Sequence, residues 1–200
     1  GTDTLTFAAV NTTLTVSNVE TITGGSSAEI LTLGTQVTTG TIDLGAGSDR
    51  LTLGNFMNTV TLSNIESVIG GATNDVVTLG AASSGGVFNL GLGNDTLNLG
   101  NFANTITATG VETLTGNANN DVVTLGSDFS GTIDLAGGTD RLITTNGTNN
   151  ITLQNIETLT GGSGVDTITI GTTAAVNVNL GAGDDTVYAG QGADTYTLGA

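Results

Sequence analysis

Aspartates that follow glycine-rich turns are the residues of this sequence best suited to chemistry. The stretch GGSGVDTIT places three glycines and Asp166 within six residues, and GAGDD ends at Asp185 nineteen residues later. Carboxylate and carbonyl oxygens are the ligands that hard cations such as calcium prefer. The chain has no His and no Cys, which excludes thiol chemistry, the usual zinc ligand sets and the commonest general base. Calcium binding by oxygen atoms is therefore the chemistry to consider.

The composition indicates which binding partners are unfavourable and whether the chain folds. The 200 residues carry 18 acidic side chains against two arginines, Arg50 and Arg141, which gives a formal net charge of −16. This charge disfavours binding to nucleic acids and to anionic membrane surfaces. No apolar run is long enough to cross a bilayer, and no signal-peptide pattern opens the chain. Hydrophobic residues make up 37% of the chain, which argues against disorder and for a folded core.

The glycine-rich turns belong to an internal repeat that runs through the whole chain. The segment DRLTLGNFMNTVTLSNIESVIGG, from Asp49, has counterparts that begin at Asp3, Asp95 and Asp140, and a partial copy begins at Asp185. We expect a single continuous solenoid over residues 1–200, and we expect it to be a fragment of a longer repeat protein because it opens and closes within a unit. The units are residues 3–48, 49–94, 95–139, 140–184 and, in part, 185–200.

A shorter period of about nine residues lies inside each unit. Each nonapeptide has a glycine-rich turn and then a short strand with an apolar centre, often with a second apolar residue two positions later, such as Leu51 and Leu53. This period predicts an all-β fold, a parallel β-solenoid with about nine residues per half-turn. A parallel β-helix with coils of 20–26 residues is the alternative. The predicted strand centres are Leu5, Leu14, Ile22, Leu31, Ile42, Leu51, Val60, Val68, Val77, Phe88, Leu97, Ile106, Leu114, Val123, Ile133, Leu142, Ile151, Leu159, Ile168, Val178, Val187 and Tyr196.

In a coil of two strands, turns that lie two nonapeptides apart stack on the same edge of the solenoid. Carboxylates stacked about 5 Å apart repel each other by a few kcal/mol, and a bridging divalent cation would turn this repulsion into binding. Each unit has five nonapeptides, an odd number, so successive units use opposite edges. The predicted stacks, on alternating edges, are Glu29–Asp49–Glu66, Asp75–Asp95–Glu112, Asp121–Asp140–Glu157 and Asp166–Asp185.

The nonapeptides resemble the GGxGxDxUx calcium-binding repeat of RTX (hemolysin-type) β-rolls. GGSGVDTIT matches this repeat at every defined position, and LGAGDDTVY (180–188) and AGQGADTYT (189–197) match except at the first Gly. The segments NIESVIGG (64–71) and NIETLTGG (155–162) resemble stretches of large bacterial RTX adhesins and surface proteins. The resemblance implies a right-handed β-roll that binds Ca²⁺. It also implies type I secretion to the outside or the cell surface of a Gram-negative bacterium.

The expected calcium ligands are the best-paired aspartates and the carbonyls of the glycine-rich turns. Turn closure by hydrogen bonds is the competing interpretation, because Asn58, Asn104 and Asn150 hold the same turn position without charge. We expect structural or solvated roles for Glu20, Glu66, Glu112 and Glu157, and plain surface charges at Asp43, Asp128 and Asp134. The predicted metal-site residues are Asp166, Asp185, Asp194, Asp75, Asp95, Asp121, Asp140, Asp49, Gly162, Gly164, Gly181 and Gly183.

These features favour a structural calcium-binding segment of a secreted bacterial surface protein, such as an adhesin stalk, a surface-layer module or an extracellular filament. The alternatives are a threonine-rich face that binds ice or another surface, suggested by triplets such as Thr59-Val60-Thr61, and a repeat region attached to a secreted enzyme. We expect no catalysis, because the chain lacks HExxH and GxSxG and its carboxylates recur periodically. Calcium is the expected partner, self-association end to end or in a lattice stays open, and no small-molecule substrate or membrane insertion is expected.

Overall fold

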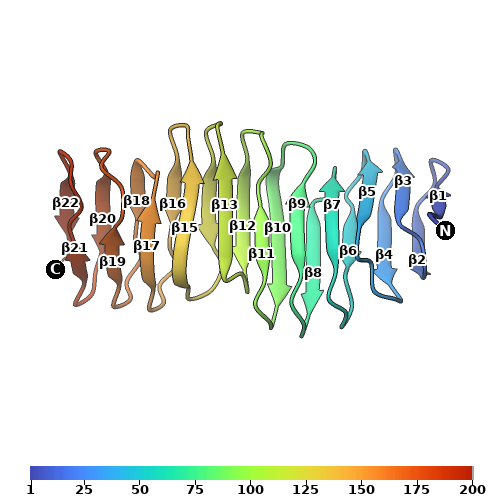
Figure 1. Cartoon of the computed structure of the whole chain (residues 1–200), viewed down its shortest axis with the longest axis horizontal. Coiled ribbons are helices and arrows are strands. Elements are labelled where there is room, and N and C mark those ends of the chain that lie inside the picture. The colour runs from blue at the N-terminus through green and yellow to red at the C-terminus, as the bar shows by residue number, and fades with distance from the viewer. Residues whose placement is uncertain (200) are drawn as a thin grey trace.

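The computed structural model describes residues 1–199, and all regular structure in that range is β-strand (Figure 1). Twenty-two strands form two parallel sheets of eleven strands each. The chain crosses to the other sheet after every strand, so each coil consists of two strands and two turns. A coil takes about 19 residues, which confirms the predicted parallel β-solenoid. Among the described residues, no helix exists that could span a membrane.

The odd-numbered strands build one sheet and the even-numbered strands build the other. All 22 predicted strand centres lie within these strands. The odd strands are β1 (Thr4–Thr6), β3 (Thr21–Gly25), β5 (Gly40–Gly45), β7 (Thr59–Ser63), β9 (Val76–Leu79), β11 (Thr96–Asn98), β13 (Thr113–Asn117), β15 (Ser130–Ala136), β17 (Asn150–Gln154), β19 (Thr167–Ile170) and β21 (Thr186–Tyr188). The even strands are β2 (Thr12–Val16), β4 (Glu29–Leu33), β6 (Arg50–Thr52), β8 (Ser67–Gly71), β10 (Ser84–Gly91), β12 (Thr105–Thr109), β14 (Val122–Leu125), β16 (Arg141–Ile143), β18 (Thr158–Thr160), β20 (Asn177–Gly181) and β22 (Thr195–Leu198).

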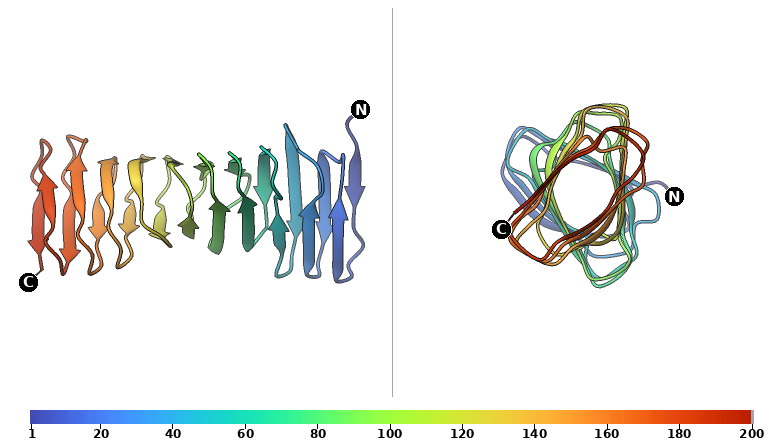
Figure 2. Two further views of the ribbon diagram at one scale, coloured as in Figure 1. Left: turned by 90° about the horizontal axis from the view of Figure 1, so that it is seen from below. Right: turned by 90° about the vertical axis from the view of Figure 1, so that its left-hand side faces the viewer.

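The core lies between the two sheets and is filled by two inward apolar rows from most strands. Leu51 and Leu53 are both 0% exposed, and the threonine between them is half-buried. Strand residues two apart share a face, so the alternation of apolar and polar residues decides which side chains point inward. Seen end on, the coils lie over one another around one axis (Figure 2). The buried Leu, Ile and Val side chains form one continuous cluster along that axis.

The register of the stack slips by two residues at three places. Ile42 of β5 lies opposite Ile22 of β3 on one side and opposite Leu62 of β7, two residues past the centre of that strand, on the other. The strands that contain Phe88 and Ile133 show the same slip. The steps of eleven or ten residues that precede these centres supply the extra residues. A shift of two keeps every side chain on its own face, so the apolar rows stay inside.

A polar side chain interrupts the inward apolar rows in the fourth unit. Thr144 occupies the position that Leu53 and Leu99 occupy in earlier units. The equivalence is shown by the backbone N–H of each residue, which donates to a carbonyl at the same place in the next coil. Thr144 is buried, and its hydroxyl has no hydrogen-bond partner. Burying an unpaired hydroxyl costs about 1–3 kcal/mol. This residue therefore weakens the core locally.

Candidate metal centre

Each paired aspartate ends a turn and stands directly before the strand that follows. Asp166 precedes β19 and is fully buried. Its Oδ1 accepts hydrogen bonds from the backbone N–H and from the side-chain Nδ2 of Asn149 in the previous coil, both at 2.9 Å. Its own N–H donates to Oδ1 of Asp185 in the next coil, also at 2.9 Å. One oxygen of each aspartate therefore links its coil to the backbone of the coil before it.

These links join sets of four stacked residues, which we call edge tetrads: an Asn, two Asp and a Glu from consecutive coils. The N–H of each member donates to the side-chain oxygen of the next. In the tetrad Asn58–Asp75–Asp95–Glu112 the three N···O distances are 2.9, 2.6 and 2.7 Å. In Asn104–Asp121–Asp140–Glu157 they are 2.9, 2.7 and 2.6 Å. The same bonds join two sets of three residues, Asn149–Asp166–Asp185 and Glu29–Asp49–Glu66. We count these two shorter sets as edge tetrads as well, with Asp166–Asp185 and Glu29–Asp49 as their central pairs.

The structure stacks the carboxylates as the sequence predicted, including the change of edge from one unit to the next. Asp75 and Asp95 lead into odd strands, whereas Asp121 and Asp140 lead into even strands. The position assigned to the third asparagine was wrong. Asn149, not Asn150, donates to the aspartate of the next coil, because the third unit is one residue shorter than the second.

The second oxygen of each paired aspartate is buried without a partner. Asp95 is 0% exposed, and its Oδ2 accepts no hydrogen bond. An ionised carboxylate oxygen in this position is costly unless a cation or a proton neutralises it. The stacked pairs are therefore the places where a cation would stabilise the fold. The unpartnered atoms are Oδ2 of Asp49, Asp75, Asp95, Asp121, Asp140, Asp166 and Asp185, and both carboxylate oxygens of Glu29.

Burial raises the pKa of six of these carboxyl groups. Burial raises the pKa of Asp95 to about 6; the N–H bond from Asp75 lowers this pKa, and the charges of Asp75 and Glu112 raise it further. Asp140 has a pKa of about 6 for the same reasons, with Asp121 and Glu157 as its neighbours. Burial also raises the pKa values of Glu29, Asp49, Asp75 and Asp121. In all six groups the cost of burying a negative charge is the largest cause of the shift.

The predicted glycines bring the turns of neighbouring coils into backbone contact. Gly181 has a φ of 81°, and a Cβ there would lie 2.0 Å from the carbonyl oxygen of Gly162. A Cβ on Gly183, with a φ of 150°, would lie 2.0 Å from the carbonyl oxygen of Gly164. No three acidic, His or Cys side chains of residues 1–199 converge as a metal cluster. A calcium ion at an aspartate pair would therefore need carbonyl oxygens of these turns or water as further ligands.

Asp194 differs from the other predicted ligands. It leads into β22, on the opposite edge from Asp185, and the residue stacked before it is Val176. Its Oδ1 accepts the N–H of Val176 at 3.0 Å, and its Oδ2 accepts the hydroxyl of Tyr196 at 2.8 Å. Both oxygens are thus engaged, and the residue stacked on Asp194 from the preceding coil brings no carboxylate.

The glutamates and two further aspartates have structural roles. Oε2 of Glu66 accepts a hydrogen bond from the N–H of Asp49 at 2.8 Å. This bond links two coils, which agrees with the structural role expected for this glutamate. Asp43 and Asp134 are more than the plain surface charges that the sequence suggested. Oδ1 of Asp43 accepts hydrogen bonds from the N–H of Gly45 and from Nδ2 of Asn64. Oδ1 of Asp134 accepts the equivalent bonds from the N–H of Ala136 and from Nδ2 of Asn155. The asparagines have φ values of 54° and 53°, so these bonds hold left-handed turns.

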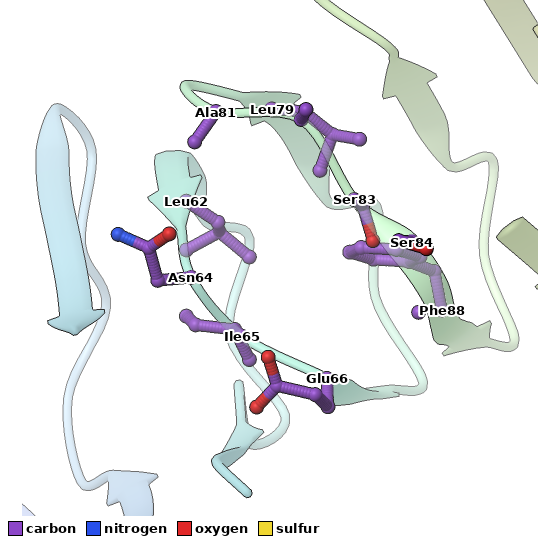
Figure 3. A pocket seen from close by; sticks show the side chains of 11 residues that line it. Leu62, Asn64, Ile65, Glu66, Leu79, Ala81, Ser83, Ser84 and Phe88 are labelled. Carbon is purple, nitrogen blue, oxygen red and sulfur yellow. The ribbon is translucent and has the colours of Figure 1, made fainter. Parts of the chain in front are cut away.

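A small cavity of about 60 Å³ lies beside Glu66, between the turn after β7 and the loop before β10 (Figure 3). Leu62, Ile65 and Phe88 form its apolar walls. Ser83 of that loop also lines it. No stacked carboxylate pair faces the cavity, so it is separate from the candidate metal positions.

A model of the RTX calcium-binding nonapeptide repeat matches four copies in this chain, over residues 106–128 and 170–200. No curated protein and no solved structure matches the chain. The matched residues include Asp121 and Asp185, which both belong to edge tetrads. The repeat is a calcium-binding repeat, in agreement with Ca²⁺ as the cofactor. The chain thus contains RTX calcium-binding nonapeptide repeats, built into a parallel β-solenoid.

Proposed function

We propose that the chain is a calcium-stiffened structural segment of a secreted bacterial surface protein, such as an adhesin stalk, a surface-layer module or an extracellular filament. The observation that carries this proposal is the stacking of buried aspartates whose Oδ2 atoms have no partner. RTX repeats are typical of proteins that Gram-negative bacteria secrete. Type I secretion, display at the cell surface and self-association of the solenoid are parts of the same proposal.

The aspartate pairs fit a calcium ion in charge and in chemistry. Asp166 with Asp185 would supply carboxylate oxygens from two consecutive coils, and the carbonyls of turn residues such as Gly162 and Gly164 would supply neutral oxygens. A bound calcium ion would neutralise the two carboxylates and hold their coils together. The backbone hydrogen bonds to Oδ1 already fix both side chains, so little conformational entropy remains to be lost on binding.

A structural role agrees better with this arrangement than a catalytic one. The RTX β-solenoid is a structural fold that is not typically catalytic. The carboxylates recur along both edges, each in the same hydrogen-bonded setting, whereas an acid–base pair needs two carboxyls with different surroundings. A repeat segment that holds two parts of a secreted protein apart needs only a rigid rod.

The outer face offers an alternative, the binding of ice or another ordered surface. Thr4, Thr21, Thr41, Thr61 and Thr78 form a continuous column across five neighbouring strands of one sheet. Asn98 and later Asp134 then interrupt the column. Threonine is also an ordinary residue of exposed strands. We therefore do not adopt this function.

Thermal unfolding with and without calcium tests the proposed function. The chain is heated in three solutions, which contain a chelator, calcium, or magnesium at the same concentration as the calcium. Circular dichroism follows the loss of the β signal in each solution. At calcium concentrations 100 times the Kd, each occupied site adds about 2.7 kcal/mol to the free energy of unfolding. We expect calcium to raise the melting temperature well above the values in chelator and in magnesium. Equal melting temperatures in all three solutions would contradict the proposal.

A further inference from the structure

We infer that each edge tetrad takes a single divalent cation, between its two central acidic residues, and that these positions alternate between the two edges of the solenoid. This inference rests on the proposed calcium binding and specifies where it occurs. It predicts one cation per unit of 45–46 residues, not one per glycine-rich turn.

Three of the four sets begin with an asparagine, which closes that end of the set to a cation. Nδ2 of Asn58 donates to Oδ1 of Asp75 at 3.0 Å and to the carbonyls of Leu53 and Phe56 at 3.2 and 2.7 Å. The amide hydrogens, which carry partial positive charge, therefore occupy the space between Asn58 and Asp75. Asn104 makes the same three bonds in the next tetrad. A cation beside these amides would be repelled.

In the three sets that end in a glutamate, that end is accessible to water. Glu66 and Glu112 are exposed and Glu157 is half-buried, and none of the three has a buried oxygen that lacks a partner. Water can solvate such a carboxylate, so no cation is needed to offset its charge. The step between the two aspartates is different, because both Oδ2 atoms of a pair such as Asp75 and Asp95 are buried and unpartnered. Only this step joins two carboxylates that solvent does not reach.

Loops without stacked acids separate the tetrads along each edge. Phe129 precedes Asn149 on the odd edge, and its N–H donates to the Asn149 Oδ1 at 3.0 Å. Ser83 has the same place before Asn104 on the even edge. Phe129 is buried and brings no oxygen ligand except its backbone carbonyl, which accepts the N–H of Asn150. Each aspartate pair is therefore isolated from the next pair on its own edge.

The alternation of edges follows from the strand count. Asp95, Asp140 and Asp185 lie 45 residues apart and lead into β11, β16 and β21, five strands apart each time. Five strands are two and a half coils, which at about 4.8 Å per coil is roughly 12 Å along the axis. This distance exceeds the Debye length of about 8 Å at physiological ionic strength. The cations should therefore bind independently in the folded chain.

The pattern extends beyond the residues matched by the repeat model. Asp75 and Asp95 lie outside both matched segments, yet Asp75 accepts and donates the same hydrogen bonds as Asp121, which lies inside the first segment. The chain has four such positions, and four divalent cations would halve its formal charge of −16. They are Glu29–Asp49, Asp75–Asp95, Asp121–Asp140 and Asp166–Asp185.

Native mass spectrometry of the 200-residue chain at increasing calcium tests the inference by counting bound ions. We expect the wild type to saturate at four ions. Asp95→Asn should lose one ion, and Asp75→Asn should also lose one. The double variant should again lose only one, because the two residues share a cation. Asn already occupies edge positions such as Asn104, so these substitutions should leave the fold intact, and circular dichroism in calcium verifies this.

The matched control is Asp134→Asn, which should keep four ions. Asn179 holds the equivalent position and already accepts the same turn hydrogen bond that Asp134 accepts. A double variant that loses two ions, or a wild type that binds about one ion per turn, would overturn the inference but leave calcium binding in place. If the wild type binds no calcium at all, both the inference and the proposed function fail.

Discussion

The two oxygens of each paired aspartate have different roles. Oδ1 of Asp95 accepts the N–H of Asp75 at 2.6 Å and so orders the turn, whereas Oδ2 stays buried and unpartnered. Turn closure and metal binding were competing interpretations of these aspartates in the sequence. In the structure one side chain can serve both, because each role uses a different oxygen. An asparagine has only one oxygen, so Asn58 and Asn104 close turns without offering a cation ligand.

The buried carboxyl groups predict how pH changes the stability of the metal-free chain. Asp95 and Asp140 have folded pKa values of about 6, above the value of about 3.9 expected in an unfolded chain. Between these values the folded chain binds more protons than the unfolded chain, so the free energy of unfolding falls as pH rises from about 4 to about 6. Above that range both states are ionised and stability levels off.

Urea unfolding in chelator between pH 4 and pH 8 measures this dependence. The urea midpoint should fall with rising pH, and the double variant Asp95→Asn/Asp140→Asn should show a flatter profile because it lacks two of the titrating groups. Calcium should act in the opposite sense, since it binds the ionised carboxylates and should bind more tightly as pH rises. A midpoint that climbs from pH 4 to pH 7 in chelator would show that these groups are not held protonated by the fold.

The loops before β5, β10 and β15 have an equivalent residue that lies at the side of the core. Val37, Ser83 and Phe129 occupy one equivalent position, since each donates its N–H to an asparagine Oδ1 of the next coil at 3.0 Å. The side chain at this position lies against a glycine near the start of the following strand in every case. Val37 and Phe129 are buried, whereas Ser83 is only partly buried and leaves the cavity beside Glu66 (Figure 3).

Ser83→Val should therefore stabilise the solenoid. Valine would fill part of the cavity, as Val37 does in the first unit, and such cavity-filling changes commonly add about 0.5–2 kcal/mol. Urea unfolding in saturating calcium measures the difference. Thr38→Val is the control, because Thr38 is exposed in the loop before β5, does not line the cavity and should change stability little. A less stable Ser83→Val protein, with Thr38→Val unchanged, would mean that the loops before β5 and β10 do not pack alike.

The strands were predictable because the apolar residues mark them one by one. Every predicted centre from Leu5 to Tyr196 lies in a strand, and the stacking of the carboxylates followed from the strand count. The register slip at Ile42 was not predictable, because a shift of two leaves the pattern of inward and outward residues unchanged. The hydrogen bonds of Asp43 were also missed. They depend on the left-handed turn at Asn64, for which the only signal is an asparagine before Ile and Glu.

The molecule as a whole is a rod in which the paired acidic residues of successive units lie half a turn apart. Each unit has five strands, so the chain reaches the opposite edge when the pattern begins again. The buried apolar cluster extends from Val16 to Leu180, is weakened at Thr144, and could hold the fold by itself. Under the proposed function, calcium would join pairs of coils at intervals, on one edge and then on the other, and would oppose bending toward either edge.

A crystal structure of the chain grown in calcium, with anomalous scattering data, tests this account most directly. We predict anomalous peaks beside the Oδ2 atoms of the stacked pairs, such as Asp75–Asp95 and Asp121–Asp140, on alternating edges of the solenoid. The asparagine and glutamate ends of the tetrads should show none. An ordered solenoid at saturating calcium without peaks at these pairs, or with peaks at every turn, would contradict the account.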